Sequence, residues 1–185
     1  MTRVQRLCVF CGSSQAADQR FAEAAQRLGT LIGEARHELV YGGGRVGLMG
    51  TLADAALGAG ARVTGIIPTG LHDREVGHTG VSEMIVVRDM QERKRRMFEL
   101  ADAVAVLPGG LGTLDEAFEA ITLKQLGLWV KPIVFVNTGG FWTPFFALVD
   151  HVIAAGFTGA AARMLYRRVS QTDEVIPACF DPEVT

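Results

Sequence analysis

The sequence has little of what would direct a chain to a membrane, a nucleic acid or a secretory route. Its 185 residues carry 18 basic and 20 acidic side chains, and the net charge of −2 excludes an overall positive field that would attract nucleic acid or anionic lipid. No apolar stretch reaches the roughly 18 residues of a membrane-spanning helix. The N-terminal segment MTRVQRLCVF turns into a predicted strand too soon to hold the apolar core of a secretory signal. We therefore expect a soluble, cytoplasmic protein that binds neither nucleic acid nor membrane.

Cysteine and histidine are also scarce, with three and four copies. Three cysteines cannot all pair, which fits a reducing compartment. Cys8 and Cys11 have the C-x-x-C spacing but stand at the end of a predicted strand, where this spacing points side chains to opposite faces. We predict buried thiols there. His72 and His78 share a loop with no second Cys or His pair, so no metal site is predicted.

Two common nucleotide-binding signatures are missing or incomplete. The Gly-Lys-Ser/Thr of a Walker loop occurs nowhere in the chain. Gly42, Gly44 and Gly47 have the spacing of the dinucleotide fingerprint, but the next predicted strand ends without the carboxylate that would hold a ribose. An NAD-dependent oxidoreductase is therefore a weak alternative.

Apolar residues are plentiful and regularly distributed. They form 49% of the chain, enough for one globular domain over residues 1–185. Runs that are apolar throughout are typical of strands buried on both faces of a parallel sheet, and helical patterns separate them. The predicted strands are 6–10, 38–42, 62–67, 83–88, 103–108 and 132–137, and the predicted helices are 18–36, 46–60, 89–101, 114–127 and 143–155. This alternation predicts an α/β fold with a doubly wound, mainly parallel sheet and helices on both faces.

Three predicted strands end in small or glycine-rich turns, at 11–14, 41–50 and 108–113. In such sheets ligands bind beyond the carboxyl ends of the strands. Glycines there let backbone N–H groups approach an anion, and a following helix N-terminus favours negative charge. Tight packing would explain one such turn, but three at one edge favour a phosphate-bearing mononucleotide. The candidate contacts in these turns are Ser13, Gly43, Gly44 and Gly109.

Two further patterns leave alternatives open. Arg93 and Lys94 follow Met90 at helical spacing, so they fall beside an apolar stripe. A cation there needs a carboxylate, a phosphate or a ligand, and a structural ion pair is as good a reading as a binding site. Thr113 and Glu116 have the spacing of a capping box at a helix start. Whether Glu116 only caps a helix or carries chemistry stays open at this point.

The segments PGGLGTLDE (108–116) and MQERKRRM (90–97) together resemble the paired signature of the Lonely Guy family. Members of that family are cytokinin riboside 5′-monophosphate phosphoribohydrolases, long mislabelled as lysine decarboxylases. The similarity runs over nearly the whole chain and includes CGSS, YGGGRVGLMG, GLHDREV and QLGLWVKPIVFVN. It implies a Rossmann-like fold, a homodimer, and hydrolysis of AMP or an N6-substituted AMP to the free base and ribose 5-phosphate.

The resemblance also implies roles for particular residues. By motif position, Arg93 and Glu116 match the catalytic pair of the family. The positions that match its substrate contacts are Glu75, Lys94, Gly110, Leu111, Gly112, Thr113, Leu114, Asp115 and Thr122. At position 115 plant members commonly have Glu, so Asp115 has a shorter reach.

Three alternatives concern function and assembly. A pyridoxal-phosphate decarboxylase needs a Schiff-base lysine, and none of the three lysines stands in such a context, so we expect no cofactor. A non-catalytic carrier of a nucleotide or of the molybdenum cofactor is the main rival, although a carrier has no need of Arg93 and Glu116. Phe145 and Phe146 could cover a partner subunit, but core packing is the default interpretation.

Overall fold

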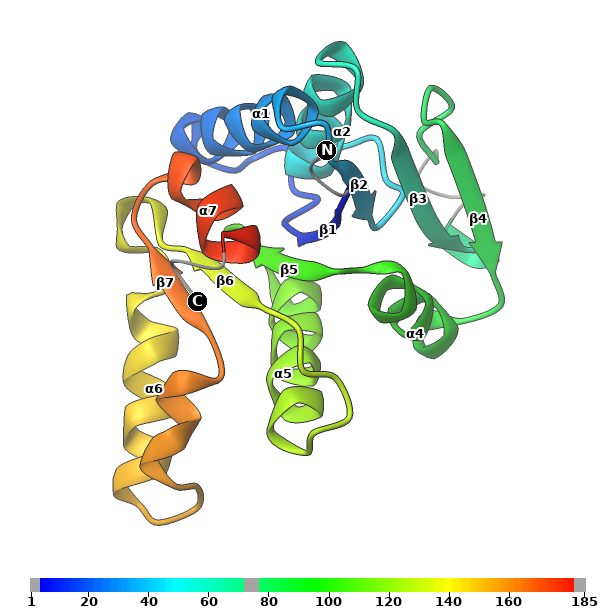
Figure 1. Cartoon of the computed structure of the whole chain (residues 1–185). Helices are drawn as coiled ribbons and strands as arrows, with labels where there is room; N and C mark the ends of the chain where they lie inside the picture. Colours follow the sequence, from blue (N-terminus) through cyan, green and yellow to red (C-terminus); the bar gives the residue numbers. More distant parts are fainter. Residues whose placement is uncertain (1–3, 72–76, 182–185) are drawn as a thin grey trace.

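A computed structural model of the chain describes residues 4–71 and 77–181. Within these ranges the backbone forms a seven-stranded sheet in which all neighbouring strands are parallel. The strands are β1 (Arg6–Phe10), β2 (Glu38–Tyr41), β3 (Val63–Pro68), β4 (Glu83–Val87), β5 (Ala103–Val106), β6 (Ile133–Val136) and β7 (Arg167–Val169). Their order in space is β4-β3-β2-β1-β5-β6-β7 (Figure 1).

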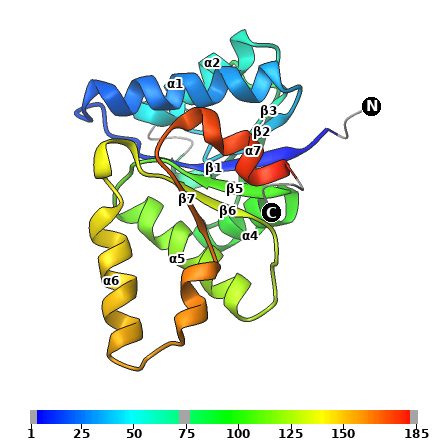
Figure 2. The same cartoon turned by 60° about the vertical axis from the view of Figure 1, so that its left-hand side comes forward.

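Helices cover both faces of this sheet. They are α1 (Gln19–Glu34), α2 (Gly47–Gly58), α4 (Met90–Leu100), α5 (Leu111–Gln125), α6 (Thr143–Ala154) and α7 (Val175–Phe180), with short 3₁₀ turns η1 (Thr138–Gly140), η2 (Ala160–Met164) and η3 (Thr172–Glu174). Figures 1 and 2 show α1, α2 and α7 on one face and α4, α5 and α6 on the other. None of the helices in the described ranges is long and apolar enough to cross a membrane.

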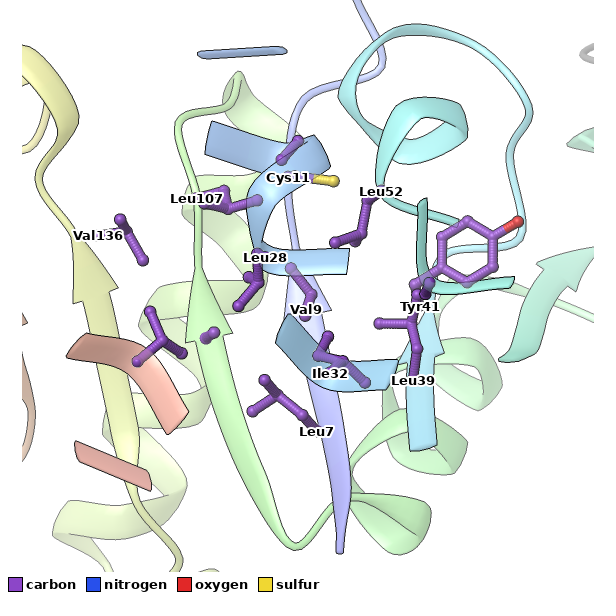
Figure 3. Packing of buried hydrophobic residues seen from close by; sticks show 14 of the residues in the cluster. Leu7, Val9, Cys11, Leu28, Ile32, Leu39, Tyr41, Leu52, Leu107 and Val136 are labelled. Carbon is purple, nitrogen blue, oxygen red and sulfur yellow. The ribbon is translucent and has the colours of Figure 1, made fainter. Parts of the chain in front are cut away.

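Each face has its own buried core, because the central strands are apolar on both sides. On the α1/α2 face, Leu7 and Val9 of β1 pack against Leu28, Ile32 and Leu52 (Figure 3). The opposite core is rich in aromatic side chains, which contact one another edge to face or stacked. These aromatic side chains include Phe10, Phe98, Trp129, Phe135, Trp142, Phe145, Phe146 and Tyr166.

Several sequence-based expectations are confirmed by this packing. Cys8 belongs to the aromatic core and Cys11 to the opposite one, so the C-x-x-C side chains do point to different faces. Both thiols are free, and burial raises the pKa of each well above its usual value. Phe145 and Phe146 are buried in the core, which was the default interpretation.

The predicted elements are all present, and the differences lie at the C-terminal end and at one helix boundary. The strand β7 and the helix α7 were not predicted, because β7 has three residues, two of them arginine, and α7 contains Pro177. The helix expected from residue 114 begins at Leu111 instead. The predicted doubly wound parallel fold is correct.

The connectivity places a switch point in the middle of the sheet. From β1 the chain moves outward through β2, β3 and β4, then returns to β5 on the other side of β1 (Figure 1). The connections that follow β1 and β5 therefore leave in opposite directions. In open α/β sheets this divergence opens a crevice beyond the carboxyl ends of the two strands, where ligands bind.

Candidate active site

A cavity of about 290 Å³ lies at this switch point, beyond the carboxyl ends of β1, β2 and β3. Its walls come from the turn after β1, the glycine turn after β2, the helix α4 and the first turns of α5. Eight of the predicted site residues line it: Ser13, Gly44, Arg93, Gly110, Leu111, Gly112, Thr113 and Glu116. Residues from four separate parts of the chain are thus brought to one site.

The other predicted contacts lie elsewhere. Gly43 and Gly109 stand directly beside lining residues, and Leu114 faces a groove between α5 and α6. Lys94 and Asp115 meet each other at the contact between α4 and α5, and Thr122 is exposed further along α5. Glu75 lies outside the described residues.

The start of α5 explains how this cavity can receive an anion. Gly110 is the N-cap, with extended backbone angles and no side-chain cap. The N–H groups of Leu111, Gly112 and Thr113 precede the first intrahelical bond, which Leu114 donates to the Gly110 carbonyl at 3.0 Å. These three residues line the cavity, so N–H donors without an intrahelical partner and the positive end of the helix dipole occur together at its wall.

The same boundary answers the question of the capping box. Because α5 begins at Leu111, Thr113 is already inside its first turn and Glu116 lies in the second. Neither side chain caps the helix, so the capping-box interpretation is wrong. The Pro-Gly-Gly turn ends the strand early enough for the helix to start before Thr113. Glu116 therefore faces the cavity from the body of the helix.

Gly109 has a packing role at this turn. A Cβ atom at this position would lie 2.1 Å from the Thr113 hydroxyl oxygen, and Thr113 is buried. A glycine is therefore required for the turn to close against the first turn of α5.

Arg93 reaches the cavity with its guanidinium held by backbone carbonyls. Its Nε donates to the carbonyl of Ile66 at 3.1 Å, and its Nη2 donates to the carbonyl of Gly42 at 3.0 Å. Among the described residues no carboxylate lies within ion-pair distance of this buried arginine. The geometry leaves its charge available to a ligand in the cavity.

Gly42 makes room for that arginine. A Cβ atom at position 42 would lie 2.0 Å from Arg93 Nη2, a distance that no side chain can tolerate. Gly42, which has the spacing of a dinucleotide fingerprint, thus leaves the space that the Arg93 guanidinium occupies. No local signal could have shown this, because the two residues are 51 positions apart.

Glu116 is the acidic member of the site. It is 6% exposed, and burial raises the pKa of its carboxyl to about 7, with Arg93 opposing the rise and Asp115 adding to it. A carboxyl with this pKa exchanges its proton near neutral pH, as a general acid or base requires. The sequence predicted Glu116 as a site residue by resemblance but could not show this burial.

Sequence reasoning missed the apolar part of the cavity wall. Met49, Ile67, Leu71 and Met97 line it, and each was interpreted only as part of a helix, strand or loop. Their side chains give the cavity low polarity away from Arg93 and the α5 N-terminus. A second cavity of about 270 Å³ shares Gly12, Ser13 and Gly110 with the first and is closed by Phe21 and Phe141. Within the described part of the chain, no group of three or more His, Cys, Asp or Glu side chains could hold a metal ion.

The chain is similar to proteins of known name over most of its length. A sequence family described as "Possible lysine decarboxylase" matches residues 49–179. Cytokinin riboside 5′-monophosphate phosphoribohydrolase LOG7 of Arabidopsis thaliana is 40% identical over 98% of this chain and 85% of its own length. A cytokinin riboside 5′-monophosphate phosphoribohydrolase from Rhodococcoides fascians is 43% identical over 84% of this chain and 79% of its own length.

Solved structures share the fold at lower identity. A molybdenum cofactor carrier protein from Chlamydomonas reinhardtii matches with a TM-score of 0.73 and 20% identity, over 95% of this chain and 96% of its own. The molybdenum cofactor binding protein of Rippkaea orientalis matches with a TM-score of 0.72 and 21% identity, over 95% of both chains. At such identities the likeness shows a common Rossmann-like fold alone.

Proposed function

Because the chain belongs to the Lonely Guy family of cytokinin riboside 5′-monophosphate phosphoribohydrolases, we propose that it hydrolyses the N-glycosidic bond of purine nucleoside 5′-monophosphates. AMP and N6-substituted AMP, as in cytokinin riboside monophosphates, are the proposed substrates, and the free base and ribose 5-phosphate are the products. One observation carries the proposal. A buried carboxyl with a pKa of about 7, an arginine without a carboxylate partner among the described residues, and a free helix N-terminus line one cavity.

The helix α5 would bind the 5′-phosphate. The N–H groups of Leu111, Gly112 and Thr113, which have no intrahelical partner, provide donors, and Ser13 lines the same cavity. This grip fixes the nucleotide at a group that does not react. Binding energy at the phosphate can then be used to hold the ribosyl–base bond beside Glu116.

Glu116 and Arg93 would act on that bond. Breaking it builds positive charge on the sugar, as in glycoside hydrolysis, and a carboxylate stabilises that charge. As the water oxygen bonds to C1′, Glu116 accepts a proton from it, and the departing base nitrogen takes a proton from solvent as the C–N bond breaks. Glu116 then releases its proton to solvent, so the net change is the addition of one water. Arg93, fixed by two backbone carbonyls, orients Glu116 or assists the departing base.

A carrier protein and a pyridoxal-phosphate decarboxylase fit these residues less well. A carrier needs a phosphate site but has no use for a buried carboxyl that exchanges its proton near pH 7. A decarboxylase needs a lysine at the cofactor, but none of the three lysines, Lys94, Lys124 and Lys131, lines the cavity.

The direct test is to incubate the protein with AMP and to measure free adenine by chromatography. We expect release by the native protein and none by Glu116→Gln. The control Glu99→Gln changes an exposed glutamate of α4 and should leave turnover unchanged. Thermal protection by AMP without any adenine release would support the carrier instead. Comparing AMP with isopentenyladenosine monophosphate, GMP and CMP would then identify the preferred base.

The proposal extends to assembly and location. A homodimer is supported by the resemblance and by apolar side chains left exposed on α5, Leu111 and Phe118 among them. Phe118 also lines an apolar groove of about 310 Å³ between α5 and α6, together with Leu148. The free cysteines support a cytoplasmic location, where thiols stay reduced.

A further inference from the structure

The ammonium group of Lys94 lies between two carboxylates of α5. The Lys94 side chain is 6% exposed, and its Nζ is 2.9 Å from Asp115 Oδ2 and 2.5 Å from Glu119 Oε2. Asp115 and Glu119 are four positions apart, so they lie on the same side of the helix. A buried ammonium group is stable only when it is paired, and here both partners come from α5. Lys94 thus joins α4 to α5 beside the cavity and does not line it.

The contact of Lys94 with Asp115 and Glu119 lies next to both candidate reactive groups, Arg93 and Glu116. Arg93 directly precedes Lys94 on α4, and Glu116 lies between the two partners of Lys94 along α5. The two ion pairs that hold Lys94 against α5 therefore also fix the position of Arg93 relative to Glu116. Two cations from α4 face three carboxylates of α5, so the cluster has one negative charge in excess when every group is ionised.

We propose that Lys94 is a positioning residue that holds α5 against α4 through Asp115 and Glu119 and sets the charge environment of Glu116. The inference rests on the proposed function, in which Glu116 is the ionising group of the reaction. It replaces the role that the family resemblance implies for Lys94, a direct substrate contact.

The charges around Glu116 agree with this role. The charged and titratable groups that interact with it electrostatically are Arg93 and Lys94 from α4, Asp115 and Glu119 from its own helix, and the thiols of Cys8 and Cys11 at β1. Both cations lower the pKa of Glu116 and both acids raise it, against a larger rise from burial. Burial raises the pKa of both thiols, which keeps them neutral. Lys94 is therefore the counter-charge to the two acids nearest Glu116 in sequence.

The experiment is the pH dependence of kcat/KM for AMP hydrolysis, which reports the pKa values of the free enzyme. It is measured in four proteins: the native chain, Lys94→Met, Glu119→Gln and the double variant. The native midpoint should lie near pH 7. Losing the cation should raise it by about one pH unit, since a neighbouring charge shifts a pKa by about that much or more. Losing the Glu119 carboxylate should lower it, and the double variant should return toward the native value. These directions hold whether Glu116 acts in its ionised or its protonated form.

Two further variants sharpen the result. Arg96→Met removes the same charge from the same helix, but Arg96 pairs with Glu99 on the exposed side, so its midpoint should stay native. Lys94→Arg keeps the charge and should also stay near the native midpoint. A substrate contact would instead give Lys94→Met a higher KM for AMP with an unmoved midpoint. That result, or unmoved midpoints in both Lys94→Met and Glu119→Gln, would overturn the proposal.

Failure of the proposed function would look different. If the native protein releases no adenine, or if Glu116→Gln keeps full turnover, the hydrolase mechanism fails. The ionisation of Glu116 can still be followed then, as the infrared carboxyl band that the native protein shows and Glu116→Gln lacks. Lys94→Met should shift the titration of that band upward, and an unshifted band would overturn the inference. If Lys94→Met fails to fold, the downward shift in Glu119→Gln decides.

Discussion

Glu116 is buried and can still ionise near neutral pH. Acidic side chains are seldom buried, and burial usually keeps them protonated. Burial raises the pKa of its carboxyl to about 7, and the positive charge of Arg93 opposes this rise, so the ionised form stays accessible. The result is a residue that is poorly suited to stabilising the fold. Its presence is explained by the cavity that it lines.

This placement predicts how stability depends on pH. The pKa of Glu116 is raised above its usual value of 4.5 by folding, so between pH 4.5 and 7 the folded protein holds a proton that the unfolded chain has released. The free energy of unfolding should therefore fall as pH rises through this window. The contribution is on the order of 3 kcal/mol. Urea denaturation at several pH values should show this slope in the native protein, and Glu116→Gln should lack it. Identical slopes in both would show that Glu116 keeps an ordinary pKa.

Gly42→Ala tests whether activity depends on the position of the Arg93 guanidinium. A Cβ atom at this position would lie 2.0 Å from Arg93 Nη2, so the guanidinium must move out of its place. Turnover of AMP should fall by about 100-fold, since a displacement of about 1 Å at a reactive group has effects of that size. Gly58→Ala is the matched control, because a Cβ atom there meets nothing within 4 Å. Equal activity of the two variants would show that Arg93 need not occupy this position.

At the scale of elements, the beginning of α5 matters most. The sequence located this helix but placed its start three residues late, at 114. Thr113 and Glu116 resembled a capping box, in which Thr113 is the N-cap and the helix begins just after it. The structure starts the helix at Leu111 because Gly110 adopts the extended backbone of an N-cap. This shift turns the residues of a presumed loop into a helix N-terminus that can bind an anion.

Leu111→Pro tests that N-terminus directly. Proline suits the first helical position, and Gly110 already has the extended backbone that precedes a proline. The change deletes one N–H group at the cavity and keeps the helix, so the KM for AMP should rise about tenfold. Leu111→Ala shortens the same side chain, which is 85% exposed, and keeps the N–H group. If both variants show the same KM, the backbone donor does not contribute to phosphate binding.

His78 shows how a second element supports the glycine turn after β2. Its ring Nε2 is 2.8 Å from Asp54 Oδ1 on α2, and its ring Nδ1 accepts from the backbone N–H of Gly80. The backbone N–H of His78 donates to the Gly43 carbonyl. These contacts tie the turn to α2. His78→Leu should therefore lower the free energy of unfolding by about 1 kcal/mol through the lost hydrogen bonds, since the Asp54 side chain is 70% exposed and water can replace its partner. Thr79→Ala, an exposed neighbour, should have little effect in the same denaturant titration.

At the scale of the whole molecule, the exposed apolar side chains of α5 bear on the proposed homodimer. The exposed apolar side chains of α5 begin at Leu111, which also lines the cavity, so a partner subunit on this face would lie next to the cavity. We expect a homodimer in size-exclusion chromatography with light scattering. Phe118→Glu should give a monomer with reduced turnover, because it places a charge in the apolar groove between α5 and α6. A native protein that is monomeric and fully active would contradict the proposed dimer.

Much of this protein could be predicted without a structure. The alternation of apolar strands and amphipathic helices is a local property, readable from spacing, and it was sufficient for the doubly wound parallel fold. The glycine turns and the two charged motifs were local as well, and they identified Arg93, Glu116 and the α5 turn as site candidates.

What only the tertiary structure decided is which side chains become neighbours. Gly42 and Arg93 are far apart in sequence, as are Lys94 and its partners on α5, and no periodicity connects them. The pKa of Glu116 depends on the loss of water around it, which follows from the packing of α4, α5 and β1. Spacing along a chain specifies the face on which a residue lies, but burial and charge depend on what the rest of the fold packs against that face.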